Sequence, residues 1–233
     1  MKISNNTKLI NRNKKISQYV LFLSLAILVI GLIWSLTSST VLSPQFSYLV
    51  LIPAYLLVQV SIFLANRWGR SPRPDEILIN SLKGLPDQYT LYNYNAGVPH
   101  LLVGPAGLWI IKPYYHSGEI TYDSAKGKFL QKGGPFFISK LFAQESLPDL
   151  IHESKQMKRV FTNFIQKGDI KIAQEPKIVN IFYSEKAEVL ANSAPEPTMN
   201  AVKLKNFIRG QAKQNPMADL KVKEITDQLP SPD

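Results

Sequence analysis

The feature that most constrains this 233-residue chain is a long stretch without charged side chains: no Asp, Glu, Lys or Arg occurs between Lys15 and Arg67. Two apolar runs within it, residues 19–36 and 47–65, are each long enough to cross a bilayer as a helix. A helix rises about 1.5 Å per residue and the hydrocarbon core is about 30 Å thick. The segment between the runs, residues 37–46, is polar, uncharged and contains serine and proline. The sequence therefore predicts a helical hairpin that crosses a membrane twice.

The basic residues around the hairpin predict its orientation. Residues 1–70 hold seven Lys or Arg and no acid, and five of these bases precede the first apolar run. Arg67, Arg70 and Arg73 follow the second run, whereas the connecting loop has no base. By the positive-inside rule, both termini and the domain that follows are expected in the cytoplasm, with the loop outside. The formal charge of +10 comes mostly from this segment, because residues 71–233 carry 20 bases against 17 acids. The position of the basic residues therefore favours a membrane protein over a nucleic-acid-binding protein as the first interpretation of the charge.

An alternative for the first apolar run is a cleaved signal peptide, because the run follows a basic start. The run is long for a signal peptide, and "SLTSST" (35–40) is a poor cleavage site. The membrane hairpin is therefore the preferred interpretation.

The rest of the chain predicts one α/β domain. Gly104-Pro105-Ala106-Gly107 joins two apolar runs, which is typical of a hairpin of buried strands. Apolar residues between Leu147 and Ile165 recur at three- and four-residue steps, which predicts a long helix. The predicted order is helix, three or four antiparallel strands, long helix, strand and helix, at residues 75–86, 88–94, 100–104, 107–112, 118–124, 145–166, 177–184 and 200–214. This order predicts an α/β sandwich with a mixed sheet.

The stretch "HLLVGPAGLWII" (100–111), the Ser117-Gly118 that follows and the order of elements resemble the NERD, or nuclease-related, domain family. The resemblance covers roughly residues 75–210 and is strongest over residues 98–120. It implies a restriction-endonuclease-like fold. It also implies a catalytic site in which carboxylates hold a divalent metal beside a lysine, since phosphodiester hydrolysis needs a metal to polarise the phosphate. A prokaryotic plasma membrane is expected from this resemblance.

The residues that the resemblance assigns to catalysis are mostly replaced in this chain. Glu76 matches the glutamate of the family's first helix. Pro99 stands where the family has an aspartate, directly before His100. Lys112 stands where the family has a glutamate, and Tyr114 stands at the lysine position. Proline offers no side-chain ligand, and a lysine brings positive charge to the metal's place. We therefore expect a domain without the family's metal site and with no cofactor, Mg²⁺ or Mn²⁺ being expected only if the protein is a nuclease.

Other residues could compensate for the lost ligands. The alternative site consists of Glu76, His100, Lys112, Glu119 and Asp123. Three bases on the predicted long helix could contact nucleic acid: Lys155, Lys158 and Arg159. In each case the simpler interpretation is a solvated or structural residue. No cysteine is present, and no phosphate-binding glycine loop, nucleophile elbow or HExxH sequence occurs.

Three functions follow as hypotheses. The preferred one is a membrane-tethered, catalytically inactive nuclease-related domain that acts as a binding or scaffold module, with nucleic acid or protein as partner. The alternatives are an active metal-dependent nuclease with a rearranged site, and a structural membrane-assembly protein. The predicted organisation is a basic N-terminus, span, external loop, span, juxtamembrane linker, NERD-like domain and C-terminal tail, at residues 1–18, 19–36, 37–46, 47–65, 66–74, 75–215 and 216–233.

Overall fold

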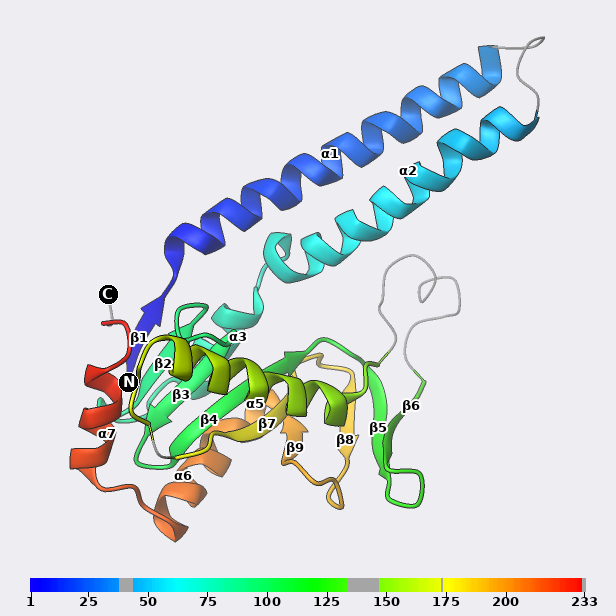
Figure 1. Cartoon of the computed structure of the whole chain (residues 1–233). Coiled ribbons are helices and arrows are strands. Elements are labelled where there is room, and N and C mark those ends of the chain that lie inside the picture. The colour runs from blue at the N-terminus through cyan, green and yellow to red at the C-terminus, as the bar shows by residue number, and fades with distance from the viewer. Residues whose placement is uncertain (38–43, 134–146, 173, 232–233) are drawn as a thin grey trace. The chain divides into compact units, whose positions relative to one another are not determined.

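The computed structural model describes residues 1–37, 44–133, 147–172 and 174–231. The chain forms two compact units (Figure 1). The sheet unit comprises Met1–Asn6 and Pro74–Asp233, and the hairpin unit comprises Thr7–Arg73. The chain therefore begins in the sheet unit, leaves it for the helices and returns to it.

The hairpin unit consists of two long helices that pack against each other, α1 (Thr7–Thr37) and α2 (Pro44–Leu64), followed by the short π-helix η1 (Ala65–Gly69). Within α1, Thr7–Ile33 is long and apolar enough to cross a membrane, with a mean hydropathy of 2.4 and only 11% of its most apolar window buried. It is the one helix with these properties among the described residues. The first predicted span, residues 19–36, lies within α1, and most of the second, residues 47–65, lies within α2.

Small side chains lie where the hairpin helices are buried. Ser17 and Ser24 of α1 are buried, as are Ala54 and Ser61 of α2, and each pair is seven residues apart. This spacing places each pair on one stripe of its helix, and small residues allow two helix backbones to approach closely. The Ser24 hydroxyl donates to the carbonyl of Leu21 at 2.8 Å, which satisfies it within its own helix. By contrast, the large apolar side chains of α1, such as Phe22, are mostly exposed.

The sheet unit is built on a mixed sheet, and within the described residues this sheet has six strands in the order β1-β2-β3-β4-β7-β9. Strands β2, β3 and β4 are antiparallel neighbours, whereas β1 is parallel to β2, β7 to β4 and β9 to β7. The strands span Lys2–Asn5, Thr90–Asn93, His100–Gly104, Gly107–Tyr114, Lys177–Phe182 and Thr198–Asn200. The predicted α/β class and mixed sheet are confirmed.

The first strand, β1, comes from the N-terminal segment. Ile3 pairs with Leu91 and Asn5 with Asn93 of β2. The segment predicted as a basic tail, residues 1–18, is thus divided between a strand of the sheet and the first turns of α1.

The predicted strand at 118–124 exists but belongs to a second sheet. Strand β5 (Gly118–Asp123) lies between β6 (Lys128–Lys132) and β8 (Ala187–Leu190) in a separate sheet, which has three strands in the described part of the chain. The alternation of apolar and polar residues over 118–124 predicts a strand, but it does not show which strand will be its neighbour in a sheet. β5 pairs with β8 because the chain returns there after β7.

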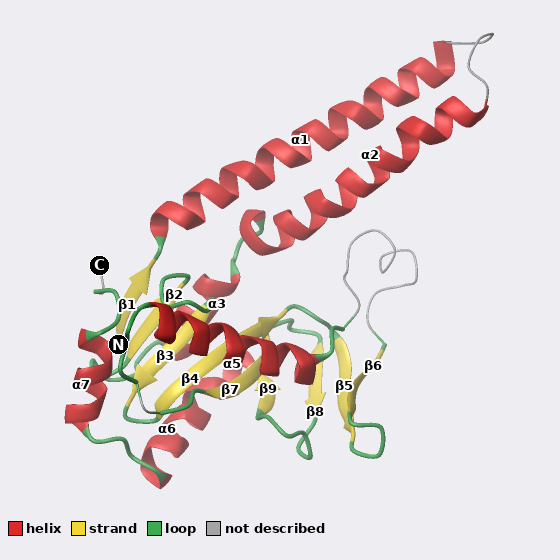
Figure 2. Cartoon of the chain, viewed as in Figure 1, coloured by secondary structure: helices red, strands yellow, loops and turns green. Residues whose placement is uncertain are grey.

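Helices cover both faces of the six-stranded sheet (Figure 2). α3 (Pro74–Leu82) and α6 (Leu204–Gln214), the latter preceded by the 3-10 turn η2 (Ala201–Lys203), pack on one face. α5 (Leu150–Lys167) and α7 (Asp219–Asp227) pack on the other. α7 lies in the region predicted only as a tail.

The alternation of β4 assigns its side chains to these two faces. Trp109 and Ile111 pack with the α3 and α6 cluster, whereas Leu108 and Ile110 pack with the α5 and α7 cluster. Because side chains alternate along a strand, Lys112 continues the series that faces α5.

Candidate functional site

The site predicted at the end of β4 is occupied by an ion pair between the sheet and α5. The Lys112 ammonium lies 2.8 Å from Glu153 Oε2 of α5. The Tyr114 hydroxyl donates to the same carboxylate oxygen at 2.7 Å. The Lys112 ammonium also lies 5.4 Å from the centroid of the Tyr114 ring. Lys112, Tyr114 and Glu153 form one cluster, here called the β4–α5 cluster.

The local sequence explains how α5 presents Glu153. Asp149 is the N-cap of the helix, and its carboxylate accepts hydrogen bonds from the N–H groups of Ile151 and His152 at 3.0 Å. Glu153 follows in the first turn, where a carboxylate is favoured by the helix dipole. Leu150 and Phe161 bury the helix against the sheet. The N-cap and the apolar stripe thus place Glu153 beside the end of β4.

Burial controls the electrostatics of this cluster. Lys112 is only 8% exposed, and the resulting desolvation lowers the pKa of its ammonium, an effect that the hydrogen bond and charge of Glu153 partly offset. Burial, together with the negative charge of Glu153 and its hydrogen bond, raises the pKa of the Tyr114 hydroxyl. The phenol therefore stays protonated and donates to Glu153, which receives two hydrogen bonds on one oxygen. The cluster satisfies its own charges.

Two further polar side chains are buried on the same side of the sheet. Asn180 of β7 pairs in register with Lys112, and Ser154 follows Glu153 on α5. Both residues are 0% exposed. Within the described residues, Asn180 Oδ1 and the Ser154 hydroxyl have no hydrogen-bond partner. A buried polar atom of this kind is usually satisfied by an internal water.

Glu76 and Lys112 lie on opposite faces of the sheet. Glu76 lies on α3, which packs with Trp109 and Ile111, whereas Lys112 faces α5. The structure therefore does not bring the family's first glutamate position to the end of β4 on the side where Lys112 and Tyr114 lie.

His100 belongs to a polar network between strands. Its Nδ1 lies 2.8 Å from Asn93 Oδ1, and the Asn93 amide donates to Asn5 Oδ1 at 2.8 Å. The ring also meets the edge of Tyr94 at a centroid distance of 5.0 Å. The carbonyl of Pro99, which precedes His100, accepts a hydrogen bond from the Tyr94 N–H at 2.8 Å. These contacts connect β1, β2 and β3, on the face that β4 turns toward α3.

Glu119 and Asp123 lie in the second sheet, both on β5. Asp123 accepts hydrogen bonds from the N–H groups of Ala125 and Lys126 at 3.0 and 3.1 Å, so it shapes the turn to β6. The two acids therefore share a strand with each other but not with Glu76, His100 or Lys112. Across residues 1–37, 44–133, 147–172 and 174–231, no three His, Asp or Glu side chains lie close enough together to hold a metal ion.

The predicted nucleic-acid contacts all lie on α5. Lys155 and Arg159 are exposed, and Lys158 is half-buried. The three side chains follow Glu153 along α5, and Lys155 and Arg159 are four residues apart, so they lie on the same side of the helix.

Sequence reasoning did not find Glu153. A strand motif shows which residues end β4, but the partner of Lys112 comes from a helix 41 residues away in the chain. One feature of the sequence could have indicated Glu153: it is an acid in the first turn of an amphipathic helix, four residues after the capping Asp149.

No protein-family model, curated protein or solved structure matches the chain. The resemblance to the NERD family therefore stays a prediction from the sequence.

Proposed function

We propose that this protein is a membrane-tethered binding or scaffold module whose sheet unit is a nuclease-related domain without the family's catalytic chemistry. The observation that carries the proposal is the β4–α5 cluster. Lys112 and Tyr114 occupy the positions that the resemblance assigns to a metal-binding glutamate and a lysine, and both contact Glu153. A buried ammonium in that place repels a divalent cation, and the one nearby carboxylate oxygen already accepts two hydrogen bonds.

The path of the chain supports a membrane hairpin with two crossings. Strand β1 and the segment from Pro74 onward fold into one unit, so they lie on the same side of any bilayer. A chain that crosses the membrane in α1 must then cross back before Pro74. α2 contains 21 residues, about 31 Å of helix, which matches the thickness of a hydrocarbon core. The bases that flank the hairpin favour the cytoplasm for the sheet unit.

The same path argues against removal of α1 as a signal peptide. Cleavage after α1 would separate β1 from the chain and leave β2 as an unpaired edge strand. Exposed edges of this kind promote aggregation. A retained first span keeps the sheet complete.

The partner of the module would bind where the sheet unit exposes positive charge. Lys155 and Arg159 are exposed on α5 and suit an anionic partner, either nucleic acid or an acidic protein surface. The β4–α5 cluster would hold α5 on the sheet, and the partner would bind the exposed face of the helix.

Cysteine labelling tests the tether, because the chain has no native cysteine. Single variants Lys2→Cys, Ser39→Cys and Ser124→Cys report on the N-terminal strand, the predicted external loop and the exposed turn between β5 and β6. A membrane-impermeant maleimide should label Ser39→Cys in intact cells and the other two variants only after permeabilisation. Labelling of Lys2→Cys and Ser124→Cys from opposite sides would contradict two crossings.

A further inference from the structure

The positive charge of this chain is concentrated in the hairpin unit. Thr7–Arg73 holds seven Lys or Arg and no Asp or Glu, so it carries a net charge of +7 out of the chain's formal +10. The sheet unit carries 20 bases and 17 acids. The hairpin unit therefore has no counter-charge of its own for its cations.

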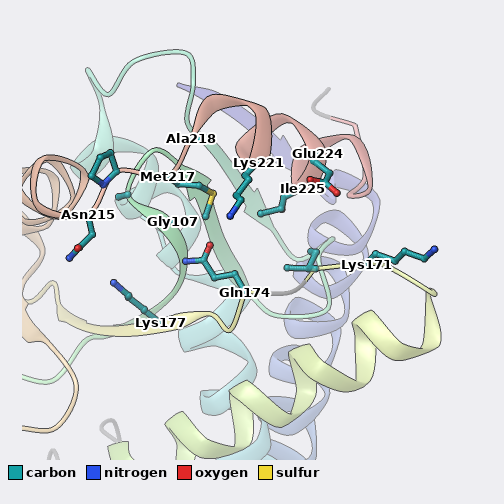
Figure 3. Close-up of a pocket in the computed structure, with 13 residues that line it drawn as sticks. Gly107, Lys171, Gln174, Lys177, Asn215, Met217, Ala218, Lys221, Glu224 and Ile225 are labelled. Atoms are coloured by element: carbon teal, nitrogen blue, oxygen red, sulfur yellow. The ribbon is translucent and has the colours of Figure 1, made fainter.

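The sheet unit, by contrast, places both signs of charge together. The pocket between the β3–β4 turn and α7 is lined by Lys221 and also by Glu224 (Figure 3). Lys177 lines the same pocket, but it pairs in register with Trp109 of β4. Its side chain points toward Asn215 in Figure 3, away from Lys221. The lysines of this pocket therefore do not form one anion site.

Three bases form one stripe along the first turns of α1. Lys8, Arg12 and Lys15 are four and three residues apart, so they lie on the same side of the helix, and all three are exposed. The opposite side carries Ile10 and Ser17, which are 5% and 2% exposed. The three bases, here called the basic stripe, therefore point away from the packed side of α1.

The π-helix η1 contributes a further base beside this part of α1. A Cβ on Gly69 of η1 would lie 3.2 Å from the Ser17 Oγ, so η1 packs against the buried side of α1. Arg67 of η1 is exposed, and its guanidinium lies 5.6 Å from the centroid of the buried Trp68 ring. Two elements of the hairpin unit thus carry bases at the same level of the hairpin.

The basic stripe ends where the apolar part of α1 begins. Tyr19 follows on the same side and is 72% exposed, and exposed apolar side chains such as Phe22 come next. Tyrosine is enriched at the membrane interface. With a rise of about 1.5 Å per residue, Arg12 and Lys8 lie about 4.5 Å and 10 Å before Lys15, whereas the headgroup layer of one leaflet is about 5–8 Å thick. In a spanning α1, Lys15 and Arg12 therefore lie among the headgroups, and the long Lys8 side chain reaches them.

We propose that the basic stripe and Arg67 bind the phosphates of anionic phospholipids, so that the hairpin unit prefers these lipids to zwitterionic ones. This inference rests on the membrane hairpin proposed above. A zwitterionic headgroup carries its own cation beside the phosphate, whereas an anionic lipid supplies the counter-charge that the hairpin unit lacks. Each base near an anionic surface contributes about fivefold to the affinity.

Electron paramagnetic resonance on the full chain, reconstituted in phosphatidylcholine bilayers, measures this preference. Spin-labelled phosphatidylglycerol and spin-labelled phosphatidylcholine are the probes, and the ratio of their association constants gives the preference. We expect a ratio above about five at low ionic strength and a ratio near one in about 1 M NaCl, because salt screens exposed charges. The triple variant Lys8→Gln/Arg12→Gln/Lys15→Gln should lower the low-salt ratio by at least about threefold.

A matched control removes the same charge from the sheet unit. Lys203, Lys213 and Lys223 are exposed on η2, α6 and α7, and their joint replacement by Gln should leave the ratio unchanged. Lys8→Arg/Lys15→Arg keeps the charge of the stripe and should also keep the ratio. Circular dichroism shows whether each variant keeps its fold, and alkaline carbonate extraction shows whether it stays in the bilayer.

The lipid preference and the membrane tether fail in different ways. A parent chain released by carbonate would overturn the tether and this inference with it. In a chain that stays in the bilayer, three results would overturn the lipid preference alone: a parent ratio near one, an unchanged ratio in the folded triple variant, or an equal fall in the sheet-unit control. Binding of a short DNA duplex through the basic stripe, without a lipid preference, would assign the stripe to nucleic acid instead.

Discussion

The Lys112 ammonium lies 2.8 Å from Glu153 Oε2 and joins the end of β4 to the first turn of α5. The two side chains differ in exposure, because the Lys112 side chain is 9% exposed and that of Glu153 is 35% exposed. The pair therefore couples a buried cation to a carboxylate that water still reaches.

This difference predicts unequal costs for removing the two partners. Glu153→Ala leaves a buried ammonium without its counter-charge and the Tyr114 hydroxyl without its acceptor, so we expect a loss of about 1–3 kcal/mol in the free energy of unfolding. Lys112→Met leaves Glu153 in contact with water and bonded to Tyr114, so its effect should stay within about 1 kcal/mol. Chemical denaturation of both variants in the same micelles measures the difference. A larger loss in Lys112→Met than in Glu153→Ala would contradict this account of the cluster.

Because Tyr92 is buried, we expect the sheet unit to lose stability at alkaline pH. Burial raises the pKa of Tyr92 to about 12 from an ordinary 10.0, with a smaller contribution from the charge of Asp227. The unfolded phenol releases its proton from about pH 10, whereas the folded phenol keeps it to about pH 12. The folded state thus holds more protons in this window, and its stability falls as the pH rises, by roughly 3 kcal/mol in total.

Tyr92→Phe should remove this dependence. The Tyr92 hydroxyl has no hydrogen-bond partner within the described residues, so the variant is expected to be at least as stable as the parent chain at pH 7. Thermal unfolding of both proteins between pH 8 and 12, in the window given by the two pKa values, measures the effect. Tyr89 and Tyr114 are present in both proteins, so their titration cancels in the comparison. Parallel curves for the two proteins would contradict the prediction.

Substitution of glycine by alanine is expected to change stability in opposite directions at Gly104 and Gly210. A Cβ on Gly104 of β3 would collide with the ring of Tyr89, which is buried against it. Gly104→Ala should therefore destabilise the sheet unit by about 1–3 kcal/mol. A Cβ on Gly210 of α6 would meet open space, so Gly210→Ala should stabilise the unit by about 0.5–1 kcal/mol through helix propensity. Melting temperatures that move in the same direction for both variants would contradict the packing described at β3.

The sequence predicted much of the fold because its signals are local. The turn at Gly104 to Gly107 fixed the β3–β4 hairpin, and the apolar period after Leu147 fixed α5. The sequence predicts this helix from residue 145; residues 145 and 146 lie outside the described residues, and α5 begins only at Leu150, after its N-cap Asp149. The sequence did not predict β1, because four residues with a lysine and a serine carry no strand signal until β2 offers an edge. The sequence did not predict α7 for a similar reason. Its apolar stripe, Val222 and Ile225, is too short to indicate a helix by itself, and these side chains are buried only because they pack on the sheet.

The candidate site was predicted in part. The motif comparison identified Lys112 and Tyr114 as the residues that end β4, and the structure brings these two together. It could not identify Glu153 as their partner, because that contact depends on where α5 crosses the sheet. Nor could it show that α3 and α5 cover opposite faces, which separates Glu76 from Lys112.

The most direct test of the central claim is a calorimetric titration of the full chain in micelles with Mg²⁺ and Mn²⁺, with and without a short DNA duplex. The account predicts no metal binding in either case and no cleavage of the duplex, because the buried Lys112 ammonium lies at the position that the resemblance assigns to a metal-binding glutamate. Metal binding that disappears in Glu76→Ala, accompanied by cleavage of the duplex, would contradict it and would make the protein a nuclease with a rearranged site.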